Sequence, residues 1–240
     1  MSHRRRGSRW LLVPVALAAA AAAFALWQWA TWPDVARLAQ ANPETTAFIE
    51  RWRERERAAG RAGKPEWRPV PYARIADDLK VAVLVGEDID FFSHDGFATH
   101  EMKQALETAW EEKQLPRGAS TITQQLAKNL WLSPSRNPWR KVKEALLTRS
   151  LERHLSKRRI LELYLNVVEL GPGVYGAEAA ARHWFGKSAA ALDRRAAAEL
   201  AASLPRPSTW HPGSASRGYA RSVERILGRI ERATWLRREI

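Results

Sequence analysis

The feature that most constrains this chain is an apolar segment of 21 residues, Trp10 to Ala30, which contains no charged side chain. About 20 apolar residues are enough for a helix to cross a bilayer, so this segment must either lie in a membrane or be removed. Arginines at positions 4, 5, 6 and 9 precede it, and the positive-inside rule then keeps the N-terminus in the cytoplasm.

Two interpretations of this segment are open. A signal peptide could be cleaved among the small residues at 18–23, but its apolar core usually covers only about 7 to 15 residues. The length of the segment favours an uncleaved anchor. We therefore predict a basic cytoplasmic tail at 1–9, a single transmembrane helix at 10–30 of the inner (cytoplasmic) membrane, and a periplasmic body.

The net charge of +13 is not confined to the tail. Without the four N-terminal arginines the chain still has 35 basic against 26 acidic residues, and a basic body indicates an anionic partner. The predicted topology keeps nucleic acid out of reach, so a phosphate-bearing lipid or an anionic membrane surface fits better. The chain has no cysteine, which excludes disulfides and thiolate metal sites.

The body is predicted to be mainly α-helical, since no alternating β pattern of useful length is present. Residues 31–71 are polar and are expected to form a linker and membrane-proximal segment, with a solvated helical face at 51–61. One domain is expected at 72–240. Its predicted helices run over Trp139–Leu155, from Ser156 as N-cap, near Gly176–His183, near Asp193–Leu204 and over Ser216–Arg238.

Four acidic residues and a histidine lie in the stretch Gly86–Gly96, directly after the apolar run Val81–Val85. A carboxylate against an apolar wall is a candidate for a raised pKa and for general acid or base chemistry. The alternative is a solvated helix end, since most acidic clusters of this kind are structural.

A second stretch, Arg117–Asn129, is rich in hydroxyl and amide groups, which hydrogen-bond sugars and phosphates without titrating. It could also be a capped helix start, with Ser120 as N-cap and Gln124 nearby, and both interpretations can hold together.

Cations gather in two further stretches, Arg140–Glu144 and Lys157–Asn166. In the first, the surrounding cations should keep Glu144 ionised; the alternative is an ordinary intrahelical ion pair with Arg140. In the second, Lys157 could reach a phosphate.

Together these stretches resemble the motifs of the peptidoglycan glycosyltransferase family (glycosyltransferase family 51). The matching segments stand in the family's order: Glu87–Gly96 (Glu-Asp-x-x-Phe-x-x-His-x-Gly), Gly118–Asn129 (Gly-x-Ser-Thr-Ile-Thr-Gln-Gln-x-x-Lys-Asn), Arg140–Glu144 (Arg-Lys-x-x-Glu) and Lys157–Asn166 (Lys-x-x-Ile-Leu-Glu-x-Tyr-Leu-Asn). Four motifs in order are far more specific than any one of them. The chain length leaves no room for a downstream transpeptidase domain, so the monofunctional subgroup is expected.

The resemblance implies a lysozyme-like fold with a smaller membrane-contacting lobe and a mobile flap at 97–117. It implies polymerisation of lipid II, a disaccharide-pentapeptide on undecaprenyl diphosphate, by transfer of an undecaprenyl-linked glycan strand to the acceptor's 4-hydroxyl with inversion. The implied partners are these substrates, the membrane and other cell-wall synthesis proteins. No cofactor is certain, although a divalent cation (Mg²⁺ or Mn²⁺) could lie near the diphosphate.

By the same resemblance, Glu87 is expected to act as the general base and Glu144 to assist near the leaving diphosphate. The residues expected to neutralise the diphosphate are Lys128, Arg140 and Lys157, and those expected to hold sugars and phosphates are Ser120, Thr121, Gln124, Gln125 and Asn129. Asp88 and His94 are expected to order the loop rather than to react.

One departure from the family pattern stands in a fifth motif, where Ala196 takes the place of the usual glutamate; we expect it to affect local stability rather than activity. Two rival functions fit much of the same sequence. A membrane-anchored lytic transglycosylase or muramidase would share the fold but would not need the cation-rich motifs. A non-catalytic wall-assembly scaffold would not need Glu87.

Overall fold

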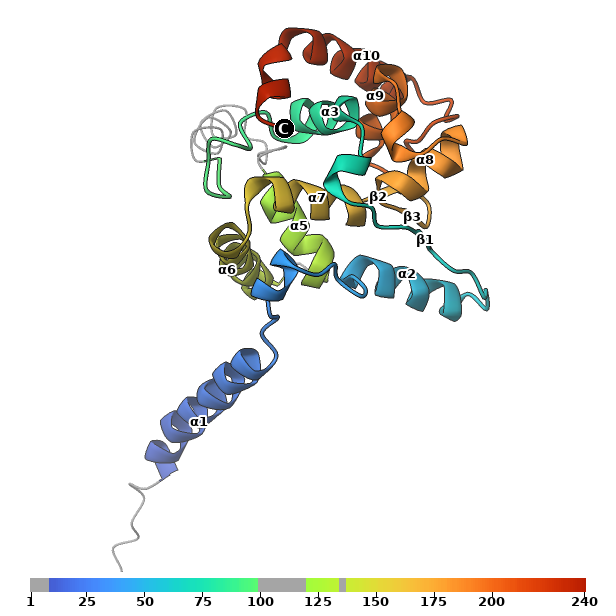
Figure 1. Ribbon diagram of the computed structural model, residues 1–240. Coiled ribbons are helices and arrows are strands. Elements are labelled where there is room, and N and C mark those ends of the chain that lie inside the picture. The colour runs from blue at the N-terminus through green and yellow to red at the C-terminus, as the bar shows by residue number, and fades with distance from the viewer. Residues whose placement is uncertain (1–8, 99–119, 134–136) are drawn as a thin grey trace, which may run out of the picture. The chain divides into compact units, whose positions relative to one another are not determined.

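The computed structural model describes residues 9–98, 120–133 and 137–240 (Figure 1). The chain divides into two compact units, 1–34 and 35–240. Its helices are α1 (Arg9–Ala30), α2 (Ala47–Ala58), α3 (Asp77–Glu87), α5 (Ile122–Trp131), α6 (Pro138–His154), α7 (Lys157–Val167), α8 (Ala177–Phe185), α9 (Arg194–Ser203) and α10 (Arg217–Arg232). The 3₁₀ helices are η1 (Ala36–Ala39), η2 (Tyr72–Arg74), η3 (Ala189–Ala191) and η4 (Thr234–Arg238). The prediction of a mainly α fold is confirmed. Most of the predicted flap at 97–117 lies outside the described residues.

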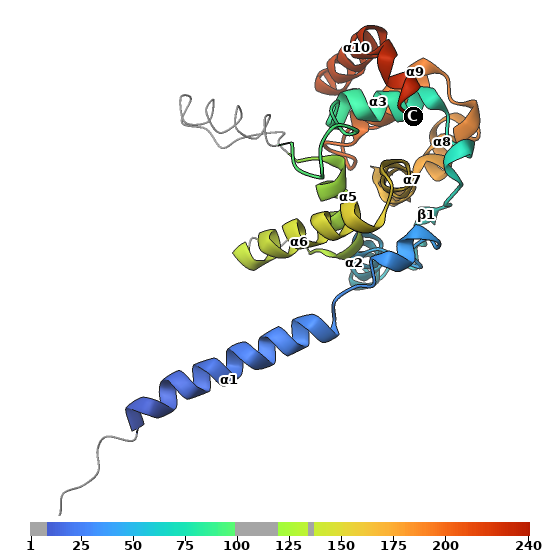
Figure 2. The same ribbon diagram turned by 60° about the vertical axis from the view of Figure 1, so that its left-hand side comes forward.

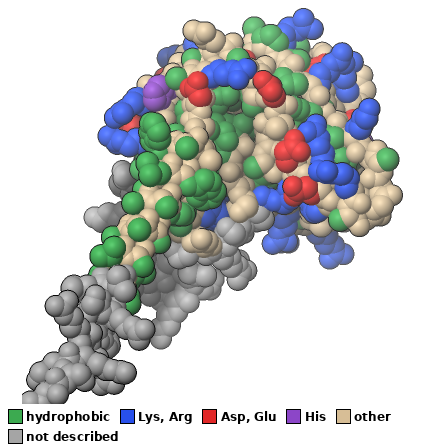
Figure 3. Space-filling view, turned by 90° about the horizontal axis from the view of Figure 1, so that it is seen from below, with side chains coloured by type: hydrophobic (Ala, Val, Ile, Leu, Met, Phe, Trp, Pro, Cys, Tyr) green, Lys and Arg blue, Asp and Glu red, His purple; other side chains and the backbone are tan. Residues whose placement is uncertain are grey.

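The first unit contains α1, which covers the predicted anchor. Its 22 residues extend about 33 Å at 1.5 Å per residue, enough for a hydrocarbon core of roughly 30 Å. The window Val13–Ala30 has a mean hydropathy of 1.6, and within the described residues α1 alone is long and apolar enough to cross a membrane. Figure 3 shows apolar side chains along this helix, whereas both signs of charge mix on the face of the body in view.

The core of the second unit is built around α3. Its residues from Leu79 to Val85 are all buried. Six of these seven residues are apolar and must be covered, and the Lys80 ammonium pairs with Asp77 at 2.8 Å. Both α9 and α10 pack against it, and in Figures 1 and 2 α10 covers the side of α3 that faces away from α5 and α7. The helix ends at Glu87 with Asp88 as its C-cap, so the acidic motif begins where the buried run stops.

A second group of helices consists of α5, α6 and α7, with α5 in contact with both others. A capping box starts α5: the Thr121 side chain accepts a hydrogen bond from the Gln124 N–H, and the Gln124 side chain accepts one from the Thr121 N–H. The prediction of Ser120 as N-cap is therefore wrong by one residue. A capping box needs Glu or Gln three positions after the cap, and Thr121 meets that condition whereas Ser120 does not.

The body also contains a small sheet, which the sequence did not predict. Its strands are β1 (Glu66–Trp67), β2 (Glu169–Gly171) and β3 (Val174–Tyr175), in the order β1-β3-β2, with β1 parallel and β2 antiparallel to β3. Strands of two or three residues are too short to show an alternating pattern. Glycine is required at Gly176 after β3, since its φ is +80° and an added Cβ would lie 2.4 Å from the carbonyl oxygen of Asn166.

Residues 35–71, expected to be linker and membrane-proximal segment, belong to the same compact unit as the domain. Arg159 of α7 donates hydrogen bonds to the carbonyl oxygens of Leu38 (2.8 Å) and Ala41 (2.9 Å). The Asn166 side chain both accepts from and donates to the backbone of Val70, and α2 packs on α5. This polar segment therefore forms part of the surface of the domain.

Three of the predicted helices match α6, α8 and α9 within two residues at each end. The fourth, α7, begins after its predicted N-cap Ser156, and Asp193 caps α9. The last predicted helix does not match: α10 stops at Arg232 and gives way to η4. Ala233 leaves helical geometry (φ −103°, ψ 40°), and the change of direction buries Leu236 while η4 contacts α3. Ala196 is buried in α9, and its N–H donates to Asp193.

Candidate active site

Glu87 stands at the end of α3, against the apolar core. Burial raises the pKa of its carboxyl above the ordinary value, and the hydrogen bond from Gln125 and the nearby charge of Lys128 oppose that rise. The Gln125 amide nitrogen donates to Glu87 Oε2 at 2.7 Å, and the buried Tyr164 hydroxyl donates to Gln125 Oε1 at 2.9 Å. Because Tyr164 holds the amide oxygen, Gln125 must present its NH₂ group to Glu87. This carboxylate is thus oriented as well as desolvated.

Lys128 lies on α5, three residues after Gln125. Burial lowers the pKa of its ammonium, while the charges of Glu144 and Glu87 act in the opposite direction. One lysine therefore interacts electrostatically with two carboxylates that are 57 positions apart in the sequence. The helices α5 and α6 pack together, and this packing brings Glu144 within range of the same ammonium as Glu87.

Glu144 lies on α6 and its side chain is only 5% exposed. Arg140, one turn earlier, donates to Glu144 Oε2 at 3.0 Å, and the Lys141 ammonium contacts the other carboxylate oxygen. The pairing with Arg140 was the alternative interpretation of this motif, and it is present. Arg140 Nε is buried without a hydrogen-bond partner among the described residues. The side chains of Arg140 and Lys141 remain 25% and 61% exposed, so both guanidinium and ammonium can still reach a ligand.

Asp88 and His94 hold the loop that follows Glu87. His94 Nδ1 accepts the Gly96 N–H at 3.1 Å, so this nitrogen carries no proton and Nε2–H donates to Asp88 Oδ1 at 2.9 Å. The other oxygen of Asp88 accepts the Ile122 N–H at 2.9 Å, at the start of α5. A helix N-terminus favours a carboxylate, and the loop is thereby tied to α5. These contacts order the loop, as the sequence predicted.

Most of the residues expected to bind substrate also form contacts within the fold. Lys157 contacts the His94 carbonyl oxygen, pairs with Glu152 at 2.9 Å and lies 4.6 Å from the centre of the Phe91 ring. Thr121 and Gln124 are buried in the capping box, and Thr121 Oγ1 also donates to the Gly96 carbonyl at 2.7 Å. The remaining members are Asn129, buried with its amide donating to the Gln125 carbonyl at 2.8 Å, and Ser120, which is exposed.

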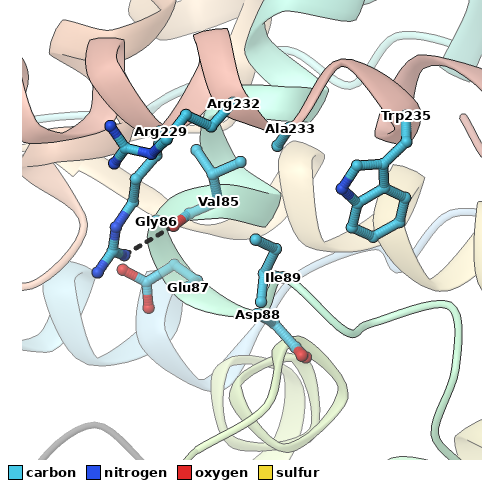
Figure 4. A pocket seen from close by; sticks show the side chains of 9 residues that line it. All are labelled: Val85, Gly86, Glu87, Asp88, Ile89, Arg229, Arg232, Ala233 and Trp235. Atoms are coloured by element: carbon cyan, nitrogen blue, oxygen red, sulfur yellow. Dashed lines mark hydrogen bonds between the residues drawn. The ribbon is translucent and has the colours of Figure 1, made fainter.

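Glu87 also lines a cavity of about 410 Å³ between the end of α3 and the C-terminal elements (Figure 4). Its wall includes Gly86, Glu87 and Ile89 from α3 and the loop, and Arg229, Arg232 and Trp235 from α10 and η4. The three C-terminal residues were missed in the sequence. Their signal was the basic amphipathic pattern of 216–238, which did not reveal that the helix end faces Glu87.

The chain matches the family model described as transglycosylase over residues 55–231. The chain belongs to this family. It is 44% identical over 233 residues to a biosynthetic peptidoglycan transglycosylase of Aromatoleum aromaticum, covering 96% of this chain and 97% of that one. It is 42% identical to the protein of that name from Thiobacillus denitrificans (92% and 97% covered) and 43% identical to that from Nitrosospira multiformis (80% and 84% covered).

In this member of the transglycosylase family, the four motifs anticipated from the sequence meet around α5. The first motif contributes Glu87, the second Gln125 and Lys128, the third Glu144 with its cations, and the fourth Tyr164. The contact of the fourth motif with Gln125 is made by Tyr164, a residue that sequence reasoning did not single out as part of the site. Its position in Tyr-Leu-Asn was visible, but its hydrogen bond to Gln125 joins residues 39 positions apart.

A protein-held divalent cation does not fit the described part of this site. No group of three or more possible ligands among the described His, Asp and Glu side chains comes together. Both oxygens of Glu144 are already occupied by Arg140 and Lys141. The reaction proposed below uses no metal ion.

Proposed function

We propose that this transglycosylase-family protein polymerises peptidoglycan glycan strands from lipid II, with inversion at the anomeric carbon and release of undecaprenyl diphosphate. Relatives that cover nearly all of the chain are named biosynthetic peptidoglycan transglycosylases. The observation that carries the proposal is Lys128, a half-buried lysine that interacts with both a desolvated carboxylate, Glu87, and a cation-bound one, Glu144. A base beside a group of cations suits a reaction whose leaving group is a diphosphate.

In the proposed step the acceptor's 4-hydroxyl oxygen forms a bond to the anomeric carbon of the growing strand. Glu87 accepts the hydroxyl proton, and a raised pKa brings its basicity closer to working pH. The bond from that carbon to the lipid diphosphate breaks, and the diphosphate leaves with the electron pair. Lys128, Arg140 and Lys141 neutralise its charge, with Glu144 holding the last two in place. A single displacement converts an α-linked diphosphate into a β-1,4 bond.

The proposed location follows from the first unit of the chain. We place α1 across the inner membrane with the four N-terminal arginines in the cytoplasm, so the domain lies in the periplasm. Both substrates carry a lipid, and an anchored domain stays at the surface where they are found. Other cell-wall synthesis proteins could meet the chain at the same membrane.

The proposal is tested with the full-length protein in lipid vesicles and purified lipid II, followed by separation of products by chain length. Polymerisation of lipid II by the unchanged protein, together with its loss in Glu87→Gln, supports a role in glycan synthesis. Shortening of existing strands without polymerisation would instead support the lytic alternative. Undiminished polymerisation by Glu87→Gln would show that Glu87 is not the general base. Activity in neither assay, with the protein folded, would favour the scaffold.

A further inference from the structure

The cavity on the α10 side of Glu87 is not used by the mechanism above. None of the residues proposed to act on the leaving diphosphate lines it: Lys128, Arg140, Lys141 and Glu144 all stand on α5 and α6. Glu87 is therefore in contact with two different spaces. One is the region of the cations on α5 and α6, where Lys128 lies near Glu87. The other is the cavity bounded by α10 and η4 (Figure 4).

The chemistry of the cavity wall is that of a site for an anionic, partly apolar ligand. Arg229 and Arg232 stand one turn apart on α10, and Arg229 uses one nitrogen to donate to the Val85 carbonyl at 2.9 Å. Among the described residues neither guanidinium forms an ion pair with a carboxylate. Trp235 and Ile89 add apolar surface that is 46% and 36% exposed. An aromatic face with unpaired arginines suits a ligand that presents both apolar area and oxyanions.

The position of the cavity next to Glu87 indicates which substrate binds there. If Glu87 removes the proton from the acceptor's hydroxyl, the acceptor must occupy space next to Glu87. The leaving diphosphate of the donor is matched by the cations on α5 and α6, and the cavity on the α10 side, which Glu87 also lines, is assigned to the acceptor. We propose that Arg232, assisted by Arg229, binds an oxyanion of the acceptor substrate in this cavity, while Trp235 packs against its sugar. This inference rests on the proposed function of the site.

Two groups of the acceptor could supply that oxyanion, a carboxylate of its stem peptide or its own diphosphate. Arginine binds either through two parallel hydrogen bonds. The soluble disaccharide-pentapeptide without lipid or phosphate, its fully amidated form, and inorganic diphosphate separate the two sources. Binding of each probe is measured with the full-length protein in detergent, so that the readout does not depend on turnover.

The test compares Arg232→Gln with Arg221→Gln. Arg221 is an exposed arginine earlier on α10 that does not line the cavity, which makes it a matched control. We expect Arg232→Gln to weaken binding about tenfold, the loss of one charged hydrogen-bond partner, and Arg221→Gln to leave it unchanged. Arg232→Lys should recover part of the affinity. Equal unfolding midpoints check that each variant is folded.

If the carboxylate is the source, the disaccharide-pentapeptide loses affinity in Arg232→Gln and the amidated form binds the unchanged protein weakly. If the diphosphate is the source, Arg232→Gln weakens the binding of inorganic diphosphate and leaves the binding of the disaccharide-pentapeptide unchanged. Either result supports the proposal. Equal effects of Arg232→Gln and Arg221→Gln, or no effect of either on any probe, would overturn it. Failure of the unchanged protein to polymerise lipid II is a separate result that bears on the proposed function.

Discussion

Two clusters of polar side chains share helix α5 but differ in how completely their charges are paired. The loop cluster consists of Asp88, His94, Glu152 and Lys157, joined to α5 through the Ile122 N–H and the Thr123 hydroxyl, which donates to Glu152 at 2.5 Å. The reaction cluster consists of Glu87, Lys128 and Glu144. In the loop cluster each charged group has a partner at contact distance. In the reaction cluster, Lys128 has no hydrogen bond or ion pair at contact distance within the described residues, although it interacts with both carboxylates.

This difference separates residues that build the site from residues that act in it. Paired buried charges hold a structure in place and lose much of their capacity for a ligand. A buried charge that is only partly compensated costs stability and remains free to interact with charge that develops in a reaction. The comparison gives Lys157, Thr121 and Gln124 contacts that stabilise the fold. It makes Lys128 the cation that we expect to act in the reaction.

The largest effect is expected for Glu87→Gln, with polymerisation reduced by about 10²- to 10⁴-fold because the base is lost. Since burial raises the pKa of Glu87, the native state binds this proton more tightly than the unfolded state does. Stability is therefore lost as the pH rises through the interval above the ordinary carboxyl value, and glutamine avoids that loss. The unfolding midpoint should be higher than that of the unchanged protein at pH 7 and equal to it below pH 4. Asp90→Asn, at an exposed position, is the control.

Lys128→Met should reduce polymerisation about 10²-fold, since it removes a cation aimed at the leaving group, while stability stays equal or rises. Burial lowers the pKa of this lysine, so its charge is a cost to the native state at pH 7. Lys64→Met, an exposed position, controls for the loss of a positive charge. Chemical denaturation measures the stability, and a clear loss of stability in Lys128→Met would contradict the comparison.

Lys157→Met should behave in the opposite way. It leaves Glu152 and the His94 carbonyl oxygen without their shared cation, and we expect the free energy of unfolding to fall by about 2 kcal/mol. Polymerisation per folded molecule should change less than in Lys128→Met. Urea unfolding and activity normalised to the folded fraction check this. A stable Lys157→Met protein with activity as low as that of Lys128→Met would return Lys157 to the substrate contacts.

The smallest effect is expected for Tyr164→Phe, about a threefold loss of activity near neutral pH, of the size of one hydrogen bond. Without the hydroxyl, Gln125 Oε1 is no longer held and its NH₂ group is no longer fixed toward Glu87. Because that donation lowers the pKa of Glu87, the acid limb of the rate profile should move to higher pH. A lower maximum rate with the acid limb at the same pH would show that Tyr164 contributes only to packing and does not affect the pKa of Glu87. Tyr175→Phe is the control, since its hydroxyl donates a hydrogen bond of 3.5 Å to the Phe48 carbonyl oxygen and to no other group in the described part of the chain.

Much of the fold could be predicted from the local sequence. The continuous apolar run in α3, the N-caps Ser156 and Asp193, and the uncharged segment of α1 each specify structure within a few neighbouring residues. The strands of the small sheet were missed because two or three residues carry no period. The N-cap of α5 was missed by one position because two hydroxyls compete for it, and only the capping box to Gln124 decides between them.

The sequence by itself determined which chemical groups are available: a carboxylate after an apolar helix, an amide-rich helix start, and a carboxylate among cations. Only the tertiary structure decided how they are used. Gln125 faces Glu87 because Tyr164, on another helix, fixes its amide. Lys128 interacts electrostatically with both Glu87 and Glu144 because the fold brings α3, α5 and α6 together. Arg232 and Trp235 line the same cavity as Glu87 because α10 and η4 both pack against α3. These pairings depend on through-space distance and on shared burial, and neither quantity is encoded in the spacing of residues along the chain.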